Sequence, residues 1–335
     1  MKKHLRSIIG ILISVGLLWW VLREVSITQV LHELGRANPW QFAGATILAT
    51  LIFPIRARKW RTIFDPVYPK LPLGPLWRAT AIGMAINNLI PARAGEAARA
   101  YAITRETDVT LSSSIASLAV DRVFDAIVLL LLAFAALADP AFPSDVKVLG
   151  GSVASWTTAG TLGVIVALVA LYSLVFFPAR LISLYEAFAR RLSPSLEEKG
   201  RNALLSFSAG LSVLKSPGHF AGVFIWTVVH WLVNAFGWWI AMKAVGIHVP
   251  FSAAVLLQSL VALGVAFPAA PGFFGVFEGA AVTGLAIYGV PKELATTWAI
   301  GFHILSFIPI TVIGAVYFSR MDLRLKDIQA KTEAQ

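Results

Sequence analysis

Long apolar blocks separated by short polar segments dominate the pattern of the chain. A helix needs about 20 mostly apolar residues to cross the hydrocarbon core of a bilayer. Six segments qualify: residues 5–22, 40–55, 112–138, 153–177, 219–241 and 294–318. The second segment is short and ends at Phe53-Pro54, so we expect its helix to extend beyond the apolar run. The pattern predicts an all-α integral membrane protein with six full transmembrane helices.

Two further apolar segments are interrupted in the middle. The first, 76–103, contains Pro91 and Gly95, and the second, 252–288, contains Pro268, Pro271, Gly272 and Gly275. Proline removes a backbone donor and clashes with the preceding turn, so a continuous helix is disfavoured through either segment. Each segment is therefore predicted to form two half-helices that meet at a break, as a re-entrant hairpin. Irregular backbone at membrane depth must face protein or a water-filled cavity.

The composition supports a membrane protein. The chain has 335 residues, of which 57% are hydrophobic and only 14% are charged, well below the roughly 25% of soluble domains. It contains no cysteine, which excludes disulfides, thiolate nucleophiles and cysteine metal sites. The net charge of +10 lies in segments between apolar blocks, as the positive-inside rule predicts, and we expect no nucleic-acid partner.

The basic residues also predict an orientation. Most of the 28 Lys and Arg residues are cytoplasmic if the N-terminus is cytoplasmic and both interrupted segments return to the side they entered. We therefore expect a multi-pass protein of the bacterial plasma (inner) membrane with both termini in the cytoplasm. Residues 1–320 form one membrane domain, 179–215 an amphipathic cytoplasmic interfacial segment, and 321–335 a tail. The basic run 56–61 is assigned to the cytoplasmic side, where it either attracts anionic lipid headgroups or only sets the topology.

The sequence NNLIPARAGEAARAYAI, residues 87–103, is the first candidate site. Asn87 and Asn88 precede the break, and Arg93, Glu96 and Arg99 follow it at a spacing of three, which places them on one helix face. A helix N-terminus favours anions, and the arginine guanidinium is a planar donor suited to phosphate. These features predict an anion-receptive site at the tip of the hairpin.

The second candidate, SLAVDRVFDAIVLLLL, places Asp121, Arg122 and Asp125 near the start of a predicted span. Ionisable side chains are costly in a membrane helix and usually face a partner or a cavity. Pairing of the carboxylates with Arg93 or Arg99 would meet that cost. Alternatively, Asp121 and Arg122 lie wet at the level of the lipid headgroups.

The third candidate, residues 266–282, repeats the order of proline, glycines and a carboxylate, here Glu278. A lone carboxylate in a membrane needs a distant partner or a proton, which makes Glu278 a candidate for proton coupling. Alternatively, Glu278 bonds free backbone groups at the break. Gly/Pro-interrupted segments in corresponding halves point to a transporter binding site, so the two segments are candidate halves of an inverted repeat.

The sequences NNLIPARAGEAAR, DRVFD and PAAPGFFGVFEG resemble the lysylphosphatidylglycerol synthase transmembrane-region family over nearly the whole chain. This flippase-like family includes the membrane half of the multiple peptide resistance factor. The resemblance implies movement of a phospholipid, such as aminoacylated phosphatidylglycerol, between leaflets. The matching positions are Asn88, Pro91, Arg93, Gly95, Glu96, Arg99, Asp121, Arg122, Asp125, Pro271, Gly272, Gly275 and Glu278. Phe273 stands where a second glycine is common in the family.

A lipid translocase is therefore the leading hypothesis, with an anionic or aminoacylated lipid as the substrate. The alternatives are a membrane-embedded lipid transferase and a non-transporting accessory protein of a lipid- or glycan-modifying complex. The chain has no P-loop, no zinc-protease helix motif and no Gly-x-Ser-x-Gly elbow, and we expect it to lack the soluble aminoacyltransferase domain of larger relatives. We expect no catalytic residues, metal or cofactor. Anionic lipids are the expected partners, and a second copy of the chain or a lipid-modifying enzyme is the open alternative.

Overall fold

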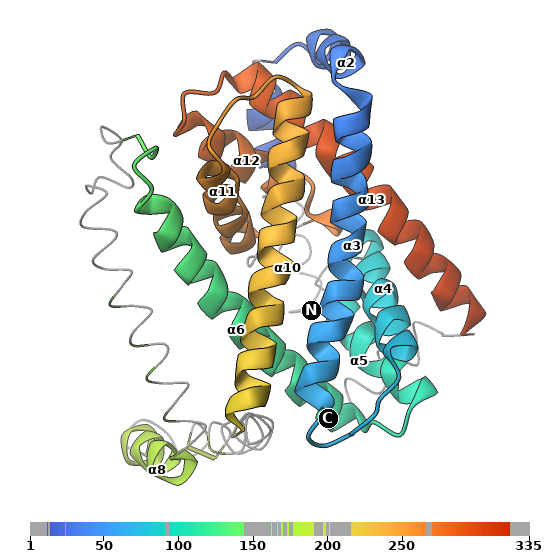
Figure 1. The fold of residues 1–335 in the computed structure, drawn as a ribbon, viewed down its shortest axis with the longest axis vertical. Helices are drawn as coiled ribbons and strands as arrows, with labels where there is room; N and C mark the ends of the chain where they lie inside the picture. The colour runs from blue at the N-terminus through green and yellow to red at the C-terminus, as the bar shows by residue number, and fades with distance from the viewer. Residues whose placement is uncertain are drawn as a thin grey trace.

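The computed structural model describes residues 14–23, 25–90, 94–143, 177–190, 216–265 and 270–321, with the single residues 12, 162, 166, 169, 173, 197, 198 and 201. Every regular element in these ranges is a helix (Figure 1). The predicted all-α class is confirmed for this part of the chain. Pro91, Arg93, Pro268, most of the predicted span 153–177 and the tail 322–335 lie outside the described residues.

Within the described residues, three helices are long and apolar enough to cross a membrane: α3 (Pro39–Phe64), α10 (Pro217–Ala244) and α13 (Lys292–Arg320). At about 1.5 Å per residue they extend for about 40 Å, which exceeds the roughly 30 Å of the hydrocarbon core. The helix α6 (Leu111–Leu137) has a similar length but carries three charged residues near its middle. These helices support an integral membrane protein.

Helix α3 is longer than its apolar run. It continues beyond Pro54 to Phe64, as expected, while it packs along α10. The basic run 56–61 is therefore helical, and Lys59 has 0% of its surface exposed, so it does not face lipid headgroups. Packing against neighbouring helices offsets the single hydrogen bond that proline removes, so the helix continues past the end of the apolar run.

Both interrupted segments form pairs of short helices. The first pair is α4 (Leu73–Leu89) and α5 (Ala94–Glu106). The second pair is α11 (Phe251–Gly264) and α12 (Val276–Ala286), with the 3₁₀ turn η2 (Pro271–Phe273) between them. The members of each pair pack against each other. With 11 to 17 residues, each helix is about 16 to 26 Å long, which is shorter than the roughly 30 Å hydrocarbon core of a bilayer.

The two pairs lie toward opposite ends of the molecule (Figure 1). Helices α4 and α5 lie beside the end of α3 that is nearest Phe64, and α11 and α12 lie at the end where α10 finishes. Each pair contributes to a separate apolar cluster, with Trp60 and Phe124 in the first and Trp298 and Met242 in the second. The two pairs thus pack into two different apolar clusters.

Close backbone approach explains why glycine is required at the first break. A Cβ atom on Gly95 would overlap the carbonyl oxygen of Gly83, and one on Gly314 would overlap that of Ala81. These glycines let α4 lie tightly between α5 and α13. The short pair is therefore held by backbone-to-backbone packing.

Two amphipathic helices, α2 (Ile27–Arg36) and α8 (Pro178–Ala189), lie at opposite ends of the molecule (Figure 1). Helix α8 falls within the predicted interfacial segment, and its Leu184 and Phe188 side chains are exposed while Ile182 and Ala189 are buried. An exposed apolar face beside arginines is typical of a helix at a membrane surface, and this placement stays a prediction.

Candidate functional site

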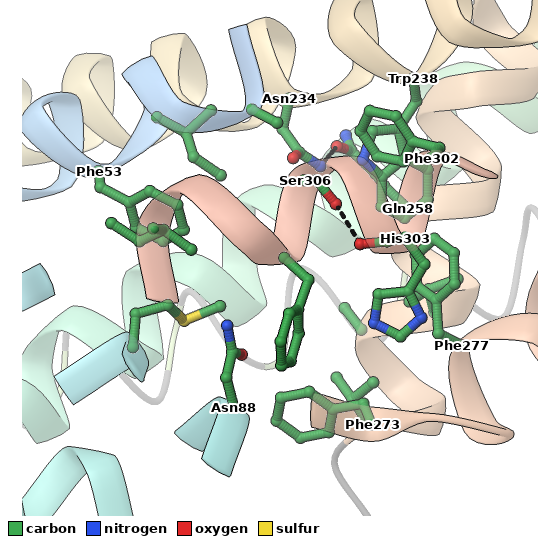
Figure 2. A pocket seen from close by; sticks show the side chains of 18 of the residues that line it. Phe53, Asn88, Asn234, Trp238, Gln258, Phe273, Phe277, Phe302, His303 and Ser306 are labelled. Carbon is green, nitrogen blue, oxygen red and sulfur yellow. Dashed lines mark hydrogen bonds between the residues drawn. The ribbon is translucent and has the colours of Figure 1, made fainter. Parts of the chain in front are cut away.

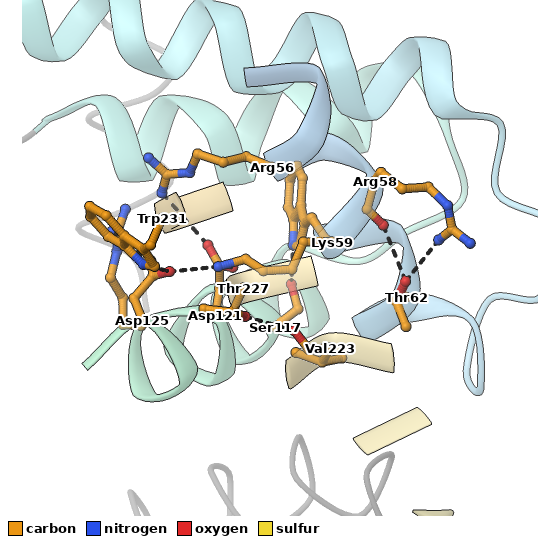
Figure 3. A network of polar contacts seen from close by, with 12 residues as sticks. Arg56, Arg58, Lys59, Thr62, Ser117, Asp121, Asp125, Val223, Thr227 and Trp231 are labelled. Carbon is orange, nitrogen blue, oxygen red and sulfur yellow. Dashed lines mark hydrogen bonds and ion pairs between the residues drawn. The ribbon is translucent and has the colours of Figure 1, made fainter. Parts of the chain in front are cut away.

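A buried ion cluster lies where α3, α5 and α6 meet. Lys59 on α3 points between two carboxylates of α6, with its Nζ 2.6 Å from Asp121 Oδ1 and 2.7 Å from Asp125 Oδ1 (Figure 3). The Lys59 and Asp121 side chains have no exposed surface. A buried charge is very costly unless it is paired, so these three residues depend on one another.

Three arginines complete the cluster. Asp121 Oδ2 lies 3.3 Å from Arg99 NH1 of α5 and 3.7 Å from Arg56 NH2 of α3. Arg122 lies 3.4 Å from Asp125 Oδ2 and forms an ion pair with Glu96 of α5. The cluster therefore contains four cationic side chains and three carboxylates, so it keeps a net positive charge when all seven groups are ionised.

Aromatic side chains hold this cluster in place. The Arg99 guanidinium lies 4.0 Å from the centroid of the Trp60 ring, a cation–π contact that is stronger when desolvated. Trp60 Nε1 donates to Ser117 Oγ at 2.8 Å, and Trp231 Nε1 of α10 donates to Asp125 Oδ1 at 3.0 Å. The charged groups are therefore fixed by four helices.

This geometry decides between the two interpretations of Asp121. The side chain is fully buried and pairs with Arg99, so Asp121 is not a wet residue at the headgroup level. Arg122 is about half exposed. Of the cations that the sequence offered as partners, Arg99 makes the contact and Arg93 lies outside the described residues.

Two asparagines precede the first break, and one of them caps the helix that follows it. Asn87 Oδ1 accepts a hydrogen bond from the backbone N–H of Gly95 at 2.9 Å, so a first-turn amide of α5 that was expected to face an anion is already bonded. Asn88 Nδ2 donates to Thr311 Oγ1 of α13 at 2.6 Å. The N-terminus of α5 is therefore partly satisfied, and the cationic side chains are the stronger anion-binding feature.

At the second break, Glu278 has two partners. Its Oε2 accepts from the backbone N–H of Gly275 at 2.6 Å, and its Oε1 lies 2.6 Å from His303 Nδ1 on α13. His303 Nε2 lies 2.9 Å from the carbonyl oxygen of Gly272. Glu278 is thus not a lone carboxylate, and one of its oxygens bonds the backbone at the break, as the second interpretation held.

The proton count of this pair follows from its partners. A carbonyl oxygen only accepts, so His303 Nε2 carries a hydrogen. One further proton must lie between Nδ1 and Glu278 Oε1, because two acceptors would otherwise face each other at 2.6 Å. The pair is therefore neutral overall, whether it is an acid with an imidazole or a carboxylate with an imidazolium.

The second break also contains unusual backbone. Gly272, Phe273 and Gly275 have φ of +65°, +62° and +84°. A Cβ on Gly275 would overlap the carbonyl oxygen of Ser14 in the N-terminal helical segment, so glycine is required there. Phe273 holds the same left-handed conformation without being glycine, which costs about 1–2 kcal/mol.

A cavity of about 240 Å³ lies between the two breaks. Asn88 lines it from the first break, and Gly272 and Phe273 line it from the second. Much of its wall is aromatic, and Figure 2 shows the side chains Phe53, Trp238, Phe273, Phe277 and Phe302 around it. Arg56 and Trp231 belong both to this wall and to the ion cluster. The cavity therefore adjoins the positive cluster.

The structure brings together five of the predicted residues in the ion cluster: Glu96, Arg99, Asp121, Arg122 and Asp125. Asn88 lies on the cavity, while Asn87 and Glu278 serve the breaks. Sequence reasoning missed Arg56 and Lys59, although their spacing of three on one helix face was a signal. It also missed His303, Asn234 and Gln258, for which no signal was present. The described residues contain no group of three His, Asp or Glu side chains suited to a metal.

Comparison with known proteins identifies the family. The sequence model of the lysylphosphatidylglycerol synthase TM region family matches residues 7–314 of this chain. Two UPF0104 membrane proteins of the archaeon Methanothermobacter thermautotrophicus are 24% and 21% identical, covering 95% and 93% of this chain and 93% and 94% of their own lengths. The glycosyltransferase AglD of Haloferax volcanii is 32% identical over 123 residues, which is 37% of this chain but only 20% of that protein. The chain therefore belongs to the lysylphosphatidylglycerol synthase transmembrane-region family of membrane proteins.

Proposed function

We propose that this protein is a lipid translocase that moves a lipid with an anionic headgroup between the leaflets of the cell membrane. One observation carries the proposal: the breaks of both short-helix pairs reach a single cavity, and Arg56 connects that cavity to a buried cluster with a net positive charge. Concave sites between broken helices are typical of transporters. The excess positive charge favours an anionic ligand.

The proposed membrane arrangement has six full spans and two re-entrant hairpins that enter from opposite leaflets. The short lengths of α4, α5, α11 and α12 and the placement of the pairs toward opposite ends support it (Figure 1). A headgroup in the central cavity would be reached from either side by movement of one hairpin. We place the protein in the bacterial inner membrane with both termini cytoplasmic, from its basic segments.

Within this mechanism the residues have separate roles. Arg56 contacts the headgroup phosphate, and Arg93 is a second proposed contact beside the first break. Lys59 and Arg99 neutralise Asp121. Arg56 lies farther from that carboxylate, at 3.7 Å, so it is the cation most easily shared with a ligand. Glu96, Arg122 and Asp125 keep the cluster aligned. Glu278 and His303 hold the second hairpin closed.

The test is leaflet transfer of fluorescent phosphatidylglycerol in reconstituted liposomes, read by quenching of the outer leaflet. The variant Arg56→Gln is expected to slow transfer at least tenfold, because it removes the cation that faces the cavity. Arg61→Gln is the matched control, since Arg61 lies on the same helix but pairs with Asp65. Transfer by Arg56→Gln at the wild-type rate would exclude this mechanism.

The partial similarity to a glycosyltransferase favours a second candidate. The chain would then be a non-transporting membrane module that holds a lipid- or glycan-modifying enzyme. This candidate predicts no leaflet transfer by the pure protein, and an unchanged cellular phenotype when Glu96→Gln and Glu278→Gln replace the wild-type chain. Transfer in liposomes by the purified protein alone would reject it.

A further inference from the structure

Three polar side chains along the cavity have nitrogen atoms without a protein partner. These atoms are Arg56 Nε, both ring nitrogens of His230 and Gln258 Nε2. His230 and Gln258 are only 2% and 1% exposed. Buried polar groups in native proteins are nearly always hydrogen-bonded, to protein, water or a ligand. Three such groups from α3, α10 and α11 on one cavity indicate a built site that a ligand completes.

The chemistry of this site is set by Asn234. Its Nδ2 donates to Gln258 Oε1 at 3.0 Å, which occupies the Gln258 oxygen and leaves the amide hydrogens free (Figure 2). Arginine has only donors, and an imidazole carries at least one N–H. The three side chains together therefore present hydrogen-bond donors, which match the acceptor oxygens of a phosphate.

The same cavity offers no counter-charge to a cationic group. No Asp or Glu is among the described residues that line it. Glu278 is bonded by Gly275 and His303, and Asp121 and Asp125 share Lys59 behind the wall. A lipid ammonium group would therefore lie near Arg56 without a carboxylate, at the cost of its hydration.

We propose, building on the translocase function above, that Arg56, His230 and Gln258 bind the phosphate of a lipid headgroup that carries no amine. Aminoacylated lipids, which the name of the family suggests, are then poor ligands of this chain. The volume of about 240 Å³ is below the roughly 300–1,000 Å³ of sites for drug-sized ligands. It accommodates a small headgroup, while the acyl tails stay beside the aromatic wall and in the bilayer.

The decisive variant is Gln258→Glu, which keeps the size of the side chain and one oxygen for Asn234. It replaces the free donor by a carboxylate oxygen in the cavity. We expect phosphatidylglycerol to bind at least tenfold more weakly, a change of about 1.4 kcal/mol, and lysyl-phosphatidylglycerol to bind more tightly. Gln29→Glu, on the exposed surface of α2, adds the same charge away from the cavity and should change neither affinity.

Isothermal titration calorimetry on the full-length protein in nonionic detergent measures these affinities. The probes are dioctanoyl phosphatidylglycerol, dioctanoyl lysyl-phosphatidylglycerol and glycerol 3-phosphate. The wild type should bind the first at least tenfold more tightly than either of the others. His230→Leu is the second variant, in case Gln258→Glu does not fold, and it should weaken phosphatidylglycerol binding without any gain for the lysyl lipid.

Equal or tighter binding of the lysyl lipid by the wild type would overturn the inference, and so would unchanged selectivity in Gln258→Glu. Binding of glycerol 3-phosphate as tight as that of the lipid would overturn the assignment to a lipid. Because these titrations involve no leaflets, selective binding without transfer in liposomes would leave the inference standing and reject the translocase.

Discussion

The two breaks share an order of residues but differ in electrostatics. At the first break, Glu96 and Arg99 of α5 join the ion cluster with Asp121 and Arg122 of α6. At the second, Glu278 is tied to one histidine and one backbone amide as a neutral pair. The cluster at the first break thus keeps a net positive charge that can attract an anionic ligand. At the second break, the charged groups bond each other and the backbone, so they stabilise the local structure.

This difference suggests a division of labour in the proposed translocase. A cluster with more cations than carboxylates gains from an arriving anion, so the first break suits recognition. The neutral pair at the second break links α12, α13 and η2. Movement of α12 away from α13 would break these hydrogen bonds, so the second break is suited to holding the hairpin in one position. The ends of a candidate inverted repeat need not have the same chemistry.

The largest expected effect is at Lys59. The variant Lys59→Met removes the cation between Asp121 and Asp125, and removal of one partner of a buried ion pair costs about 3–5 kcal/mol. We expect a large fall in the thermal unfolding temperature of the protein in detergent. Lys70→Met, on the exposed surface, should have almost no effect, and equal effects of the two variants would contradict the ionic account of the first break.

The next prediction compares Asp121→Asn with Glu278→Gln. Asp121→Asn leaves Lys59 and Arg99 without their shared carboxylate and should cost about 3 kcal/mol or more. Glu278→Gln should cost less than about 1 kcal/mol, because glutamine can accept from Gly275 and donate to the neutral His303 ring. Thermal unfolding in detergent measures both.

The variant Glu278→Ala measures what both hydrogen bonds of Glu278 contribute to stability. It loses both hydrogen bonds of the wild-type side chain, and we expect a cost of about 2 kcal/mol. If Glu278→Gln proves as damaging as Asp121→Asn, the Glu278–His303 pair is a carboxylate with an imidazolium, and the two breaks are electrostatically alike after all.

The sequence was most informative where a local rule governs the backbone. Proline and glycine placed both breaks, since their effects depend on nearest neighbours. The long apolar runs placed α3, α10 and α13. An extension of α3 beyond its apolar run was expected, but its end at Phe64 was not predictable, because packing against α10 and buried pairing carry that helix past Pro54. For the same reason the sequence did not show that Lys59 is buried.

These local rules could not identify contact partners that are distant in the sequence. His303 lies 25 residues from Glu278 and Lys59 lies 66 from Asp125, and neither pairing leaves a local pattern. Gln258 was not a candidate because a single amide in an apolar helix has no distinctive spacing. Charge balance was the available guide: a carboxylate in a membrane needs a partner, which predicted that Asp121 would be paired but did not identify Lys59.

The smallest effect concerns Phe273, a residue with a Cβ that holds a left-handed backbone conformation at the second break. At φ of +62° a residue with a Cβ is strained, so Phe273→Gly should be more stable than Phe273→Ala by about 1 kcal/mol. The neighbouring Phe274 has φ of −54°, and there the alanine variant should be the more stable, by about 0.5–1 kcal/mol. Thermal unfolding in detergent compares the glycine and alanine variants at each of the two positions. Both variants at a position lack the aromatic ring, so their difference reports the backbone conformation alone. The same order at both positions would show that Phe273 is unstrained and that the second break does not require a left-handed turn there.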